Sequence, residues 1–245
     1  MTGNTAHIEV NARRYRLPEA PVAVICIDGC ADEYLTESFA QGVMPRTQQM
    51  VRQGYRGLVR GALPSFTNVN NTAIVTGCPP RDTGICGNFF IDPDSGEEVM
   101  MNDPQWVRRP TILAAAQNAG RRVAFVTAKD KLRRLLSVGL DPARSIAFSA
   151  ERAADTLAEE HGISDTESLV GPAPEIYSPD ASVYTLKAGV ELARAGRADF
   201  MYLSLTDYMQ HAYAPDQPES LAFYAELDEQ IGRLLDLGCV VGITA

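Results

Sequence analysis

The chain has 245 residues, which is enough for one large domain or two small ones. Its 45% hydrophobic and 22% charged residues are typical of an ordinary globular protein. The formal net charge of −9 and the pI near 4.9 argue against general binding to nucleic acid or to anionic membranes, since both favour dense Lys and Arg.

The sequence also bears on cellular location. No apolar run reaches the roughly 20 residues needed to cross a bilayer, and Met1–Leu17 contain no apolar stretch of the signal-peptide type. The five Cys residues are an odd number in a long chain, which is typical of reduced thiols rather than of a disulfide framework. We therefore expect a cytoplasmic protein. The sequence leaves the oligomeric state open, with a homodimer as one option.

Predicted strands and helices alternate along the chain. In chain order, we expect a strand at Val22–Ile27, a helix at Pro45–Gln53, a short strand at Gly57–Leu63, a helix at Asn71–Thr76, a helix at Ile112–Asn118, a strand at Arg122–Thr127, a helix at Val183–Ala195, a strand at Phe200–Thr206, a helix at Pro218–Asp236 and a final strand-like run at Cys239–Ala245. The polar stretch Gly87–Arg109 is predicted to be a loop or a small hairpin, and Asp141–Pro179 show no clear pattern.

This alternation predicts an α/β fold with a mostly parallel central sheet and helices on both faces. We expect a single domain over residues 1–245. Functional groups in open α/β sheets gather at the carboxyl ends of the strands. The first predicted strand leads directly into Asp28, and the strand at Phe200–Thr206 leads into Asp207. A functional site at this edge of the sheet is therefore predicted.

Asp28, Asp207 and His211 are candidate metal ligands. The Asp-x-x-x-His spacing puts Asp207 and His211 on one face if the segment turns helical after the strand. A carboxylate and an imidazole so placed suit a zinc-like ion. The alternatives are a helix-capping Asp, a turn-forming Asp28 and a surface His. His211 is the only one of three His residues near a predicted strand end, which favours the metal site.

Four further residues could act on a substrate. Thr67 lies at a loop-to-helix junction, where a hydroxyl can serve as a nucleophile or simply cap the helix. Asn88, between a glycine and aromatic residues, can donate to a phosphoryl oxygen or form a turn. Lys129 and Lys131 follow a strand end and can clamp a carboxylate or phosphoryl group. Their alternative is a solvated basic face continued by Arg133 and Arg134.

Taken together, these segments resemble the alkaline phosphatase superfamily, and more closely its nucleotide pyrophosphatase/phosphodiesterase-like branch. The resemblance spans the chain from about Val22 onward. It rests on motifs that occur in the order of that branch: a strand ending in Asp28, Pro64-x-x-Thr67-x-x-x-Asn71, Gly84-Ile85-x-Gly87-Asn88 followed by Asp92-Pro93, and Asp207-x-x-x-His211. With Lys129 and Lys131 included, the pattern is similar to that of the phosphonoacetate-hydrolysing members.

The resemblance implies a site with two divalent metal ions, most simply zinc. Asp28 and Thr67 would contact one ion, and Asp207 and His211 the other. Thr67 would be the nucleophile and form a phospho-threonine. The remaining roles would fall to Asn88 at a phosphoryl oxygen and to Lys129 and Lys131 at the substrate carboxylate. The implied reaction is hydrolysis of the P–C bond of phosphonoacetate, a small-molecule substrate, to acetate and phosphate.

The chain departs from the family pattern in one respect. In the family, a strand like Val240–Ala245 is followed by an Asp-His pair and a glycine, with another His further on, and this chain contains none of them. We therefore expect a C-terminally incomplete piece of a longer protein, with a shortened relative as the alternative.

Other functions are weighed against this one. A phosphodiesterase or nucleotide pyrophosphatase on the same scaffold would need no lysine pair, and a catalytically inert module would bind no metal. A sulfatase is disfavoured because Cys78-Pro79-Pro80-Arg81 is one residue shorter than the Cys-x-Pro-x-Arg pattern. Dinucleotide binding is disfavoured because no G-x-G-x-x-G follows the first predicted strand.

Overall fold

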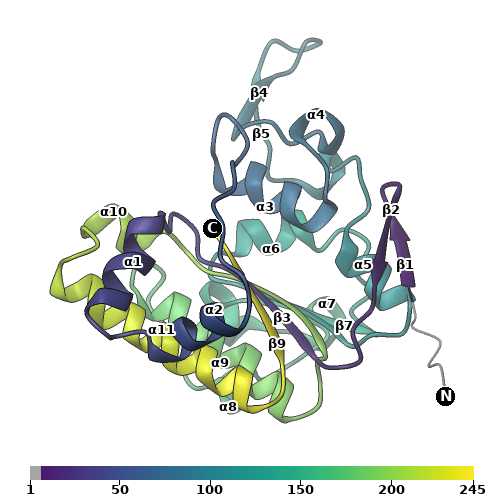
Figure 1. Ribbon diagram of the computed structural model, residues 1–245. Coiled ribbons are helices and arrows are strands. Elements are labelled where there is room, and N and C mark those ends of the chain that lie inside the picture. Colours follow the sequence, from purple (N-terminus) through teal and green to yellow (C-terminus); the bar gives the residue numbers. More distant parts are fainter. Residues whose placement is uncertain (1–6) are drawn as a thin grey trace.

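A five-stranded, wholly parallel sheet forms the centre of the protein (Figure 1). The computed structural model describes residues 7–245. The order of the strands across the sheet is β7–β6–β8–β3–β9. Their bounds are Val22–Cys26 for β3, Val123–Thr127 for β6, Ser145–Ser149 for β7, Phe200–Ser204 for β8 and Val240–Thr244 for β9. Parallel neighbours need crossover connections, and helices supply them, as the alternating pattern predicts.

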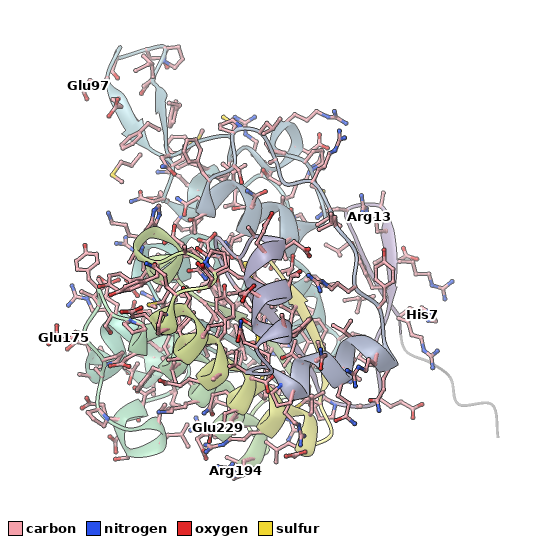
Figure 2. All side chains as sticks on the ribbon, turned by 60° about the vertical axis from the view of Figure 1, so that its left-hand side comes forward. His7, Arg13, Glu97, Glu175, Arg194 and Glu229 are labelled. Carbon is pink, nitrogen blue, oxygen red and sulfur yellow. The ribbon has the colours of Figure 1, made fainter. Side chains whose placement is uncertain are left out.

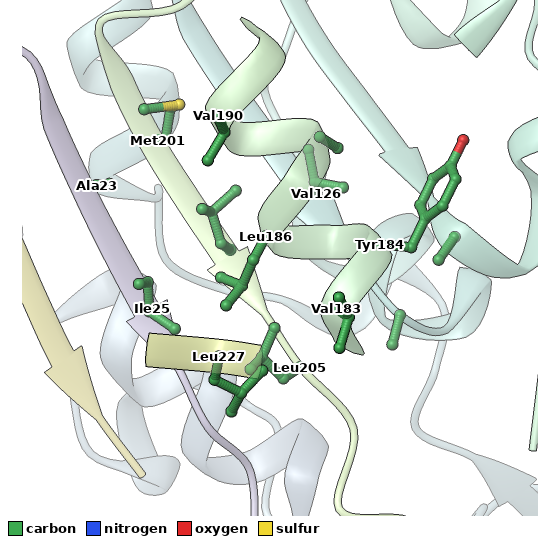
Figure 3. Close-up of a cluster of buried hydrophobic side chains, with 14 of the residues drawn as sticks. Ala23, Ile25, Val126, Val183, Tyr184, Leu186, Val190, Met201, Leu205 and Leu227 are labelled. Atoms are coloured by element: carbon green, nitrogen blue, oxygen red, sulfur yellow. The ribbon is translucent and has the colours of Figure 1, made fainter. Parts of the chain in front are cut away.

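One face of the sheet is covered by α9 (Asp180–Arg194) and α11 (Pro218–Asp236), and α1 (Asp32–Ala40) and α2 (Pro45–Gln53) pack against α11. Figure 3 shows Leu186 and Val190 of α9 against Ile25 and Met201 of the strands. Full burial of a Leu or Val side chain contributes about 1.5 to 3 kcal/mol. The packing of this helical layer therefore stabilises the sheet whose strand ends form the rim.

The opposite face is covered by α3 (Thr67–Thr76), α5 (Ile112–Asn118) and α6 (Asp130–Leu136). Successive residues of a strand point to opposite faces, so Ile25 packs in the first layer and Cys26 in this one. Phe125 and Tyr202 stack here with ring centroids 5.8 Å apart. Helices on both faces confirm the predicted α/β fold.

Smaller elements surround this core. Two antiparallel hairpins flank the sheet, β1–β2 and β4–β5, and Figure 2 shows Glu97 at the far end of the second and His7 and Arg13 on the first. The bounds are His7–Val10 for β1, Arg13–Arg16 for β2, Pro80–Thr83 for α4, Phe89–Ile91 for β4, Glu98–Met100 for β5, Pro104–Trp106 for η1, Ala150–Asp155 for η2, Ala158–His161 for α7, Thr166–Val170 for α8 and Tyr208–Ala212 for α10.

The strand predicted at Gly57–Leu63 is wrong. This segment has no regular structure, and Leu58, Val59 and Leu63 are almost fully exposed. An extended run becomes a strand only when a neighbour accepts its backbone hydrogen bonds, and no described strand lies alongside it. Helix α3 begins at Thr67, four residues before the predicted start.

Other segments agree with the predictions or complete them. Helices α2, α5 and α11 have the predicted bounds, and Thr111 caps α5 by accepting from Ala114 N at 3.1 Å. Gly87–Arg109 contain the small hairpin β4–β5, whereas Asp141–Pro179 contain β7 and short helices. Residues 1–6 lie outside the described residues. They are the start of the segment Met1–Leu17 and of the domain predicted at 1–245. Within residues 7–245, every helix is too short or too polar to span a bilayer.

Candidate active site

Three adjacent strands end at one rim of the sheet, and each is followed by a charged residue. In the register, Ser204 of β8 lies opposite both Cys26 of β3 and Thr127 of β6. The alignment persists beyond the strands, because Leu205 N donates to Cys26 O at 2.8 Å and Ala128 N donates to Ser204 O at 3.0 Å. Asp28, Asp207 and Lys129 therefore emerge side by side, although the sequence separates each from the next by 78 positions or more.

Gly29 allows the loops after β3 and β8 to approach each other. Its φ of +72° lies in the left-handed region that favours glycine. A Cβ atom at this position would lie 3.2 Å from Asp207 Cβ and 3.3 Å from Gln210 Cβ. The absent side chain therefore lets the backbone beside Asp28 lie directly against Asp207.

Thr67 is the first residue of α3 and faces Asp28. Its hydroxyl donates to Asp28 Oδ2 at 2.7 Å. The N-cap residue is Phe66, and no side chain caps this helix end. The capping alternative for the Thr67 hydroxyl is therefore not what the structure shows. The first N–H groups of a helix have no intrahelical partner, so this hydroxyl lies beside donors that suit an anion.

Asn71 ties the start of α3 to strand β8. Its buried amide oxygen accepts from the Tyr202 hydroxyl at 2.6 Å and from Ser204 Oγ at 2.8 Å. Its Nδ2 donates to the carbonyl oxygen of Thr67 at 3.0 Å. The amide thus links the residue that carries the candidate nucleophile to the strand that leads to Asp207.

Replacing Asn71 with leucine should lower the free energy of unfolding by about 2 to 4 kcal/mol, because two buried hydroxyls lose their acceptor. Urea unfolding followed by circular dichroism measures this loss. Asn118→Leu is the matched control, since Asn118 is exposed at the end of α5. Equal unfolding midpoints for Asn71→Leu and the unmodified protein would contradict the bracing role.

Asp207 and His211 form a second pair beside the first. His211 Nε2 lies 3.0 Å from Asp207 Oδ2, at the i,i+4 spacing that α10 provides. Lys129 Nζ lies 3.8 Å from Asp207 Oδ1. Asp207 occupies the N-cap position of α10, but its side chain makes no capping hydrogen bond. The His211 side chain is 79% exposed, so its second nitrogen is accessible.

The electrostatics of Asp28 reflect this crowding of acids. Burial raises the pKa of the Asp28 carboxyl, and the negative charge of Asp207 raises it further. The hydrogen bond from Thr67 and the positive charge of Lys129 only partly oppose these effects. A buried carboxylate beside a second acid is a place where a bound cation is stabilised.

Five of the predicted site residues line a single cavity of ≈ 230 Å³, namely Asp28, Thr67, Asn88, Lys129 and Lys131. Asp207 is connected to this cavity through its contact with Lys129, and His211 contacts Asp207 in turn. The remaining lining residues were not predicted: Asn68, Phe89, Met100, Asn102, Thr127, Leu132, Leu205 and Thr206. A larger hollow of ≈ 460 Å³ over α1 is lined mainly by acidic residues and has neither a lysine nor the candidate nucleophile, so we do not place the chemistry there.

Three of the eight unpredicted lining residues, Phe89, Met100 and Asn102, come from the β4–β5 hairpin and its flank. Phe89 and Met100 lie opposite each other in the hairpin register, and Asn68 Nδ2 donates to Met101 O at 3.2 Å. This contact attaches the hairpin to α3. The sequence did not predict that the hairpin reaches the cavity, because short strands in a polar stretch show no hydrophobic periodicity. Thr127 and Thr206 follow the strand-end rule that identified Asp28, and that rule would have found them.

The residues present fit a metal site in donor type. Two carboxylates, a hydroxyl and an imidazole are ligands that zinc accepts, and the mutual repulsion of Asp28 and Asp207 favours a cation between the pairs. In number they fall short, since residues 7–245 contain no group of three or more His, Cys, Asp or Glu side chains arranged around one ion. The structure therefore offers two pairs of candidate ligands rather than a closed tetrahedral site.

A model of the type I phosphodiesterase/nucleotide pyrophosphatase family matches residues 22–237, a span that includes every candidate site residue. The chain belongs to this family. Membership agrees with the predicted resemblance and with the observed fold. An uncharacterized pyrophosphatase/phosphodiesterase of Schizosaccharomyces pombe is 24% identical over 224 residues, which are 89% of this chain and 41% of that protein.

Comparison with solved structures gives closer matches. Phosphonoacetate hydrolase from Sinorhizobium meliloti 1021 in complex with phosphonoacetate has a TM-score of 0.93 at 45% identity. The same protein in complex with phosphonoformate has a TM-score of 0.92 at 46% identity. The murine ectonucleotide pyrophosphatase/phosphodiesterase 5, at 16% identity and a TM-score of 0.55, shares the fold.

The matches differ in length from this chain. The two bacterial structures align with 99% of this chain, which in turn spans 59% of their length. The murine structure aligns with 91% of this chain, and this chain spans 56% of the length of the murine structure. The family, the fold and the likeness to phosphonoacetate hydrolase therefore extend over nearly the whole chain, while the relatives contain further sequence.

Proposed function

We propose that the protein hydrolyses the P–C bond of phosphonoacetate to acetate and phosphate in a metal-dependent reaction. One observation carries this proposal: Lys129 and Lys131 line the same small cavity as Thr67 and Asp28. A cation pair opposite a nucleophile suits a substrate with a carboxylate at one end and a phosphonate at the other. The likeness to phosphonoacetate hydrolase from Sinorhizobium meliloti supports the same substrate.

Thr67 is the proposed nucleophile. After the hydroxyl gives up its proton to solvent, the Thr67 alkoxide would attack phosphorus in line with the departing carbon, so that an O–P bond forms as the P–C bond breaks and a phospho-threonine results. The electron pair of the broken bond leaves with the acetate fragment, which takes a proton from solvent. Water then cleaves the phospho-threonine to release phosphate. Asp28 holds the Thr67 hydroxyl toward the cavity in advance of this attack.

Lys129 and Lys131 are the proposed carboxylate clamp. The leaving acetate carries negative charge that spreads into its carboxylate as an enolate. Ammonium groups already in place stabilise this charge as it develops, which is the principal way in which active sites lower such barriers. Asn88, on the loop before β4, lines the same cavity and would donate to a phosphoryl oxygen.

The size of the cavity favours a small substrate. Pockets for drug-sized ligands are roughly 300 to 1,000 Å³, and the ≈ 230 Å³ found here is below that range. Phosphonoacetate has few atoms, whereas a nucleotide carries a base and a ribose. A substrate panel monitored by ³¹P NMR, containing phosphonoacetate, methylphosphonate and a nucleotide phosphodiester, tests the proposal directly. Cleavage of the nucleotide with phosphonoacetate left intact would overturn it.

Two divalent metal ions, with zinc as the proposed identity, would neutralise phosphoryl oxygens and lower the pKa of the attacking groups. In the proposed assignment, Asp28 and Thr67 hold one ion and Asp207 and His211 hold the other. This chain supplies only part of a full ligand set for each.

Replacing His211 with alanine should reduce the bound zinc by about one equivalent, because a tetrahedral site depends on each ligand. Inductively coupled plasma mass spectrometry of the dialysed protein gives the metal content. His7→Ala is the matched control, since His7 lies on the β1–β2 hairpin and is not among the residues that line the cavity. Unchanged zinc in His211→Ala would remove His211 from the ligand set.

A phosphodiesterase or nucleotide pyrophosphatase on the same scaffold is the second candidate, because the family model that matches is named for those activities. It would use Thr67 and the same metal ligands but would gain nothing from Lys129 and Lys131. A catalytically incomplete piece is the third candidate. That piece would retain the fold and release no product from any member of the substrate panel.

A further inference from the structure

Asp130 lies between the two cavity lysines in the sequence, but its side chain makes hydrogen bonds to other parts of the protein and is not among the cavity-lining residues. Lys129 and Lys131 both line the cavity, whereas the Asp130 carboxylate accepts from Arg133 Nε at 2.6 Å and from Ser149 Oγ at 3.2 Å. The peptide N–H of Asp130 donates to Glu151 Oε2 at 2.8 Å. The middle residue of Lys-Asp-Lys is therefore bound on both its side chain and its backbone, at the point where strand β6 turns into α6.

Arg133 anchors this turn to the interior. Its side chain is only 8% exposed, and Nη2 donates to Glu160 Oε1 at 2.9 Å in addition to the contacts with Asp130. Burial alone would raise the pKa of the Asp130 carboxyl, but the hydrogen bond and the positive charge of Arg133 hold it below its ordinary value. A charge this deeply buried requires a partner, so the pair resists separation.

The network corrects the alternative in which Arg133 continues a solvated basic face. The charge of Arg133 is matched within the protein by Asp130 and Glu160. The charges of Lys129 and Lys131 are not used in this network. With Asp130 held by Arg133 and Ser149, the two flanking lysines remain at the cavity.

We propose that Asp130 and Arg133 are positioning residues, which hold the β6–α6 turn so that Lys129 and Lys131 meet the carboxylate of a small phosphonate substrate. The inference rests on the proposed function and deepens it, since it explains how two flexible lysine side chains become selective. Long side chains lose conformational entropy when a ligand orders them. A fixed backbone leaves the two lysines fewer conformations before binding, so that less entropy is lost when the substrate binds.

Asp130→Asn tests the proposal through binding as well as turnover. Isothermal titration calorimetry of the zinc-supplied protein compares phosphonoacetate with methylphosphonate, which has the same phosphonate group but no carboxylate. We expect Asp130→Asn to reduce the preference for phosphonoacetate by roughly tenfold, while methylphosphonate affinity stays within about twofold. KM for phosphonoacetate should rise by a similar factor, with kcat less affected.

Asp155→Asn is the matched control, because Asp155 forms an ion pair with Arg152 at the same three-residue spacing but in an exposed position. It should leave both affinities unchanged. A preference for phosphonoacetate that survives Asp130→Asn intact would overturn the positioning role. Failure of the proposed function has a different signature, since the unmodified protein would then show no preference between the two ligands.

A second variant and a ligand-free measurement cover the case in which Asp130→Asn fails to fold. Glu160 is about half exposed, so Glu160→Gln should fold and loosen Arg133 with a smaller loss of preference. Hydrogen–deuterium exchange over residues 128–133 should be faster in either variant than in the unmodified protein. Unchanged exchange in a folded variant would show that the network does not hold the turn, and would overturn the proposal without any substrate.

Discussion

Replacing Thr67 with alanine is expected to abolish the release of phosphate and acetate from phosphonoacetate. Loss of a nucleophile that acts together with its activating partners lowers kcat by roughly 10⁴-fold or more. The hydroxyl that donates to Asp28 at 2.7 Å is the group removed. Product release is measured in the complete protein with zinc supplied, by phosphate assay and by NMR of acetate.

Two variants separate the chemical role of Thr67 from damage to the helix. Thr72→Ala removes a hydroxyl from the same helix, but that hydroxyl donates to Asn68 O at 2.6 Å within α3. It should retain most of the activity. Thr67→Ser keeps a hydroxyl at the reacting position and should restore part of it. Near-normal turnover in Thr67→Ala would rule out the nucleophile assignment.

Replacing Lys129 with alanine should lower kcat/KM for phosphonoacetate on the order of 100- to 1,000-fold, which is the typical effect of losing one preorganised charge partner. Hydrolysis of an activated aryl phosphonate ester should fall far less, because its leaving group carries no carboxylate. Steady-state kinetics on both substrates measure the difference.

Arg134→Ala is the matched control for Lys129→Ala. Arg134 is an exposed cation on the same helix, α6, and is not among the residues that line the cavity. Its removal changes the net charge equally and should leave both reactions unaffected. Equal losses on the two substrates in Lys129→Ala would mean that the lysine serves the phosphoryl group or the fold, and not the substrate carboxylate.

The sequence carried most of the information about the central layers. Strand runs bounded by turn residues and helices with clear caps were predictable, because their periodicity reflects burial on one or both faces. The error at Gly57–Leu63 has a physical cause. An apolar extended run is equally compatible with a strand and with an exposed loop, and the presence of a pairing neighbour, which no local pattern reports, decides between them.

The candidate site was predictable where it follows a topological rule. Asp28, Asp207 and Lys129 were found because strand ends in a parallel sheet meet at one rim. The hairpin residues Phe89 and Met100 were not found, because they reach the cavity through the contact of Asn68 with Met101.

By itself, the sequence determined the class of fold, the alternation of its elements and the types of side chain available for chemistry, since these depend on local pattern and composition. Only the tertiary structure decided which of those side chains meet. The Thr67 hydroxyl turned out to face Asp28 rather than to cap its helix, and Asn71 joins Tyr202 across 131 positions of the chain. Arg133 likewise proved to be a buried partner of Asp130. Such contacts arise from the packing of distant segments, and a linear pattern does not specify which segments become neighbours.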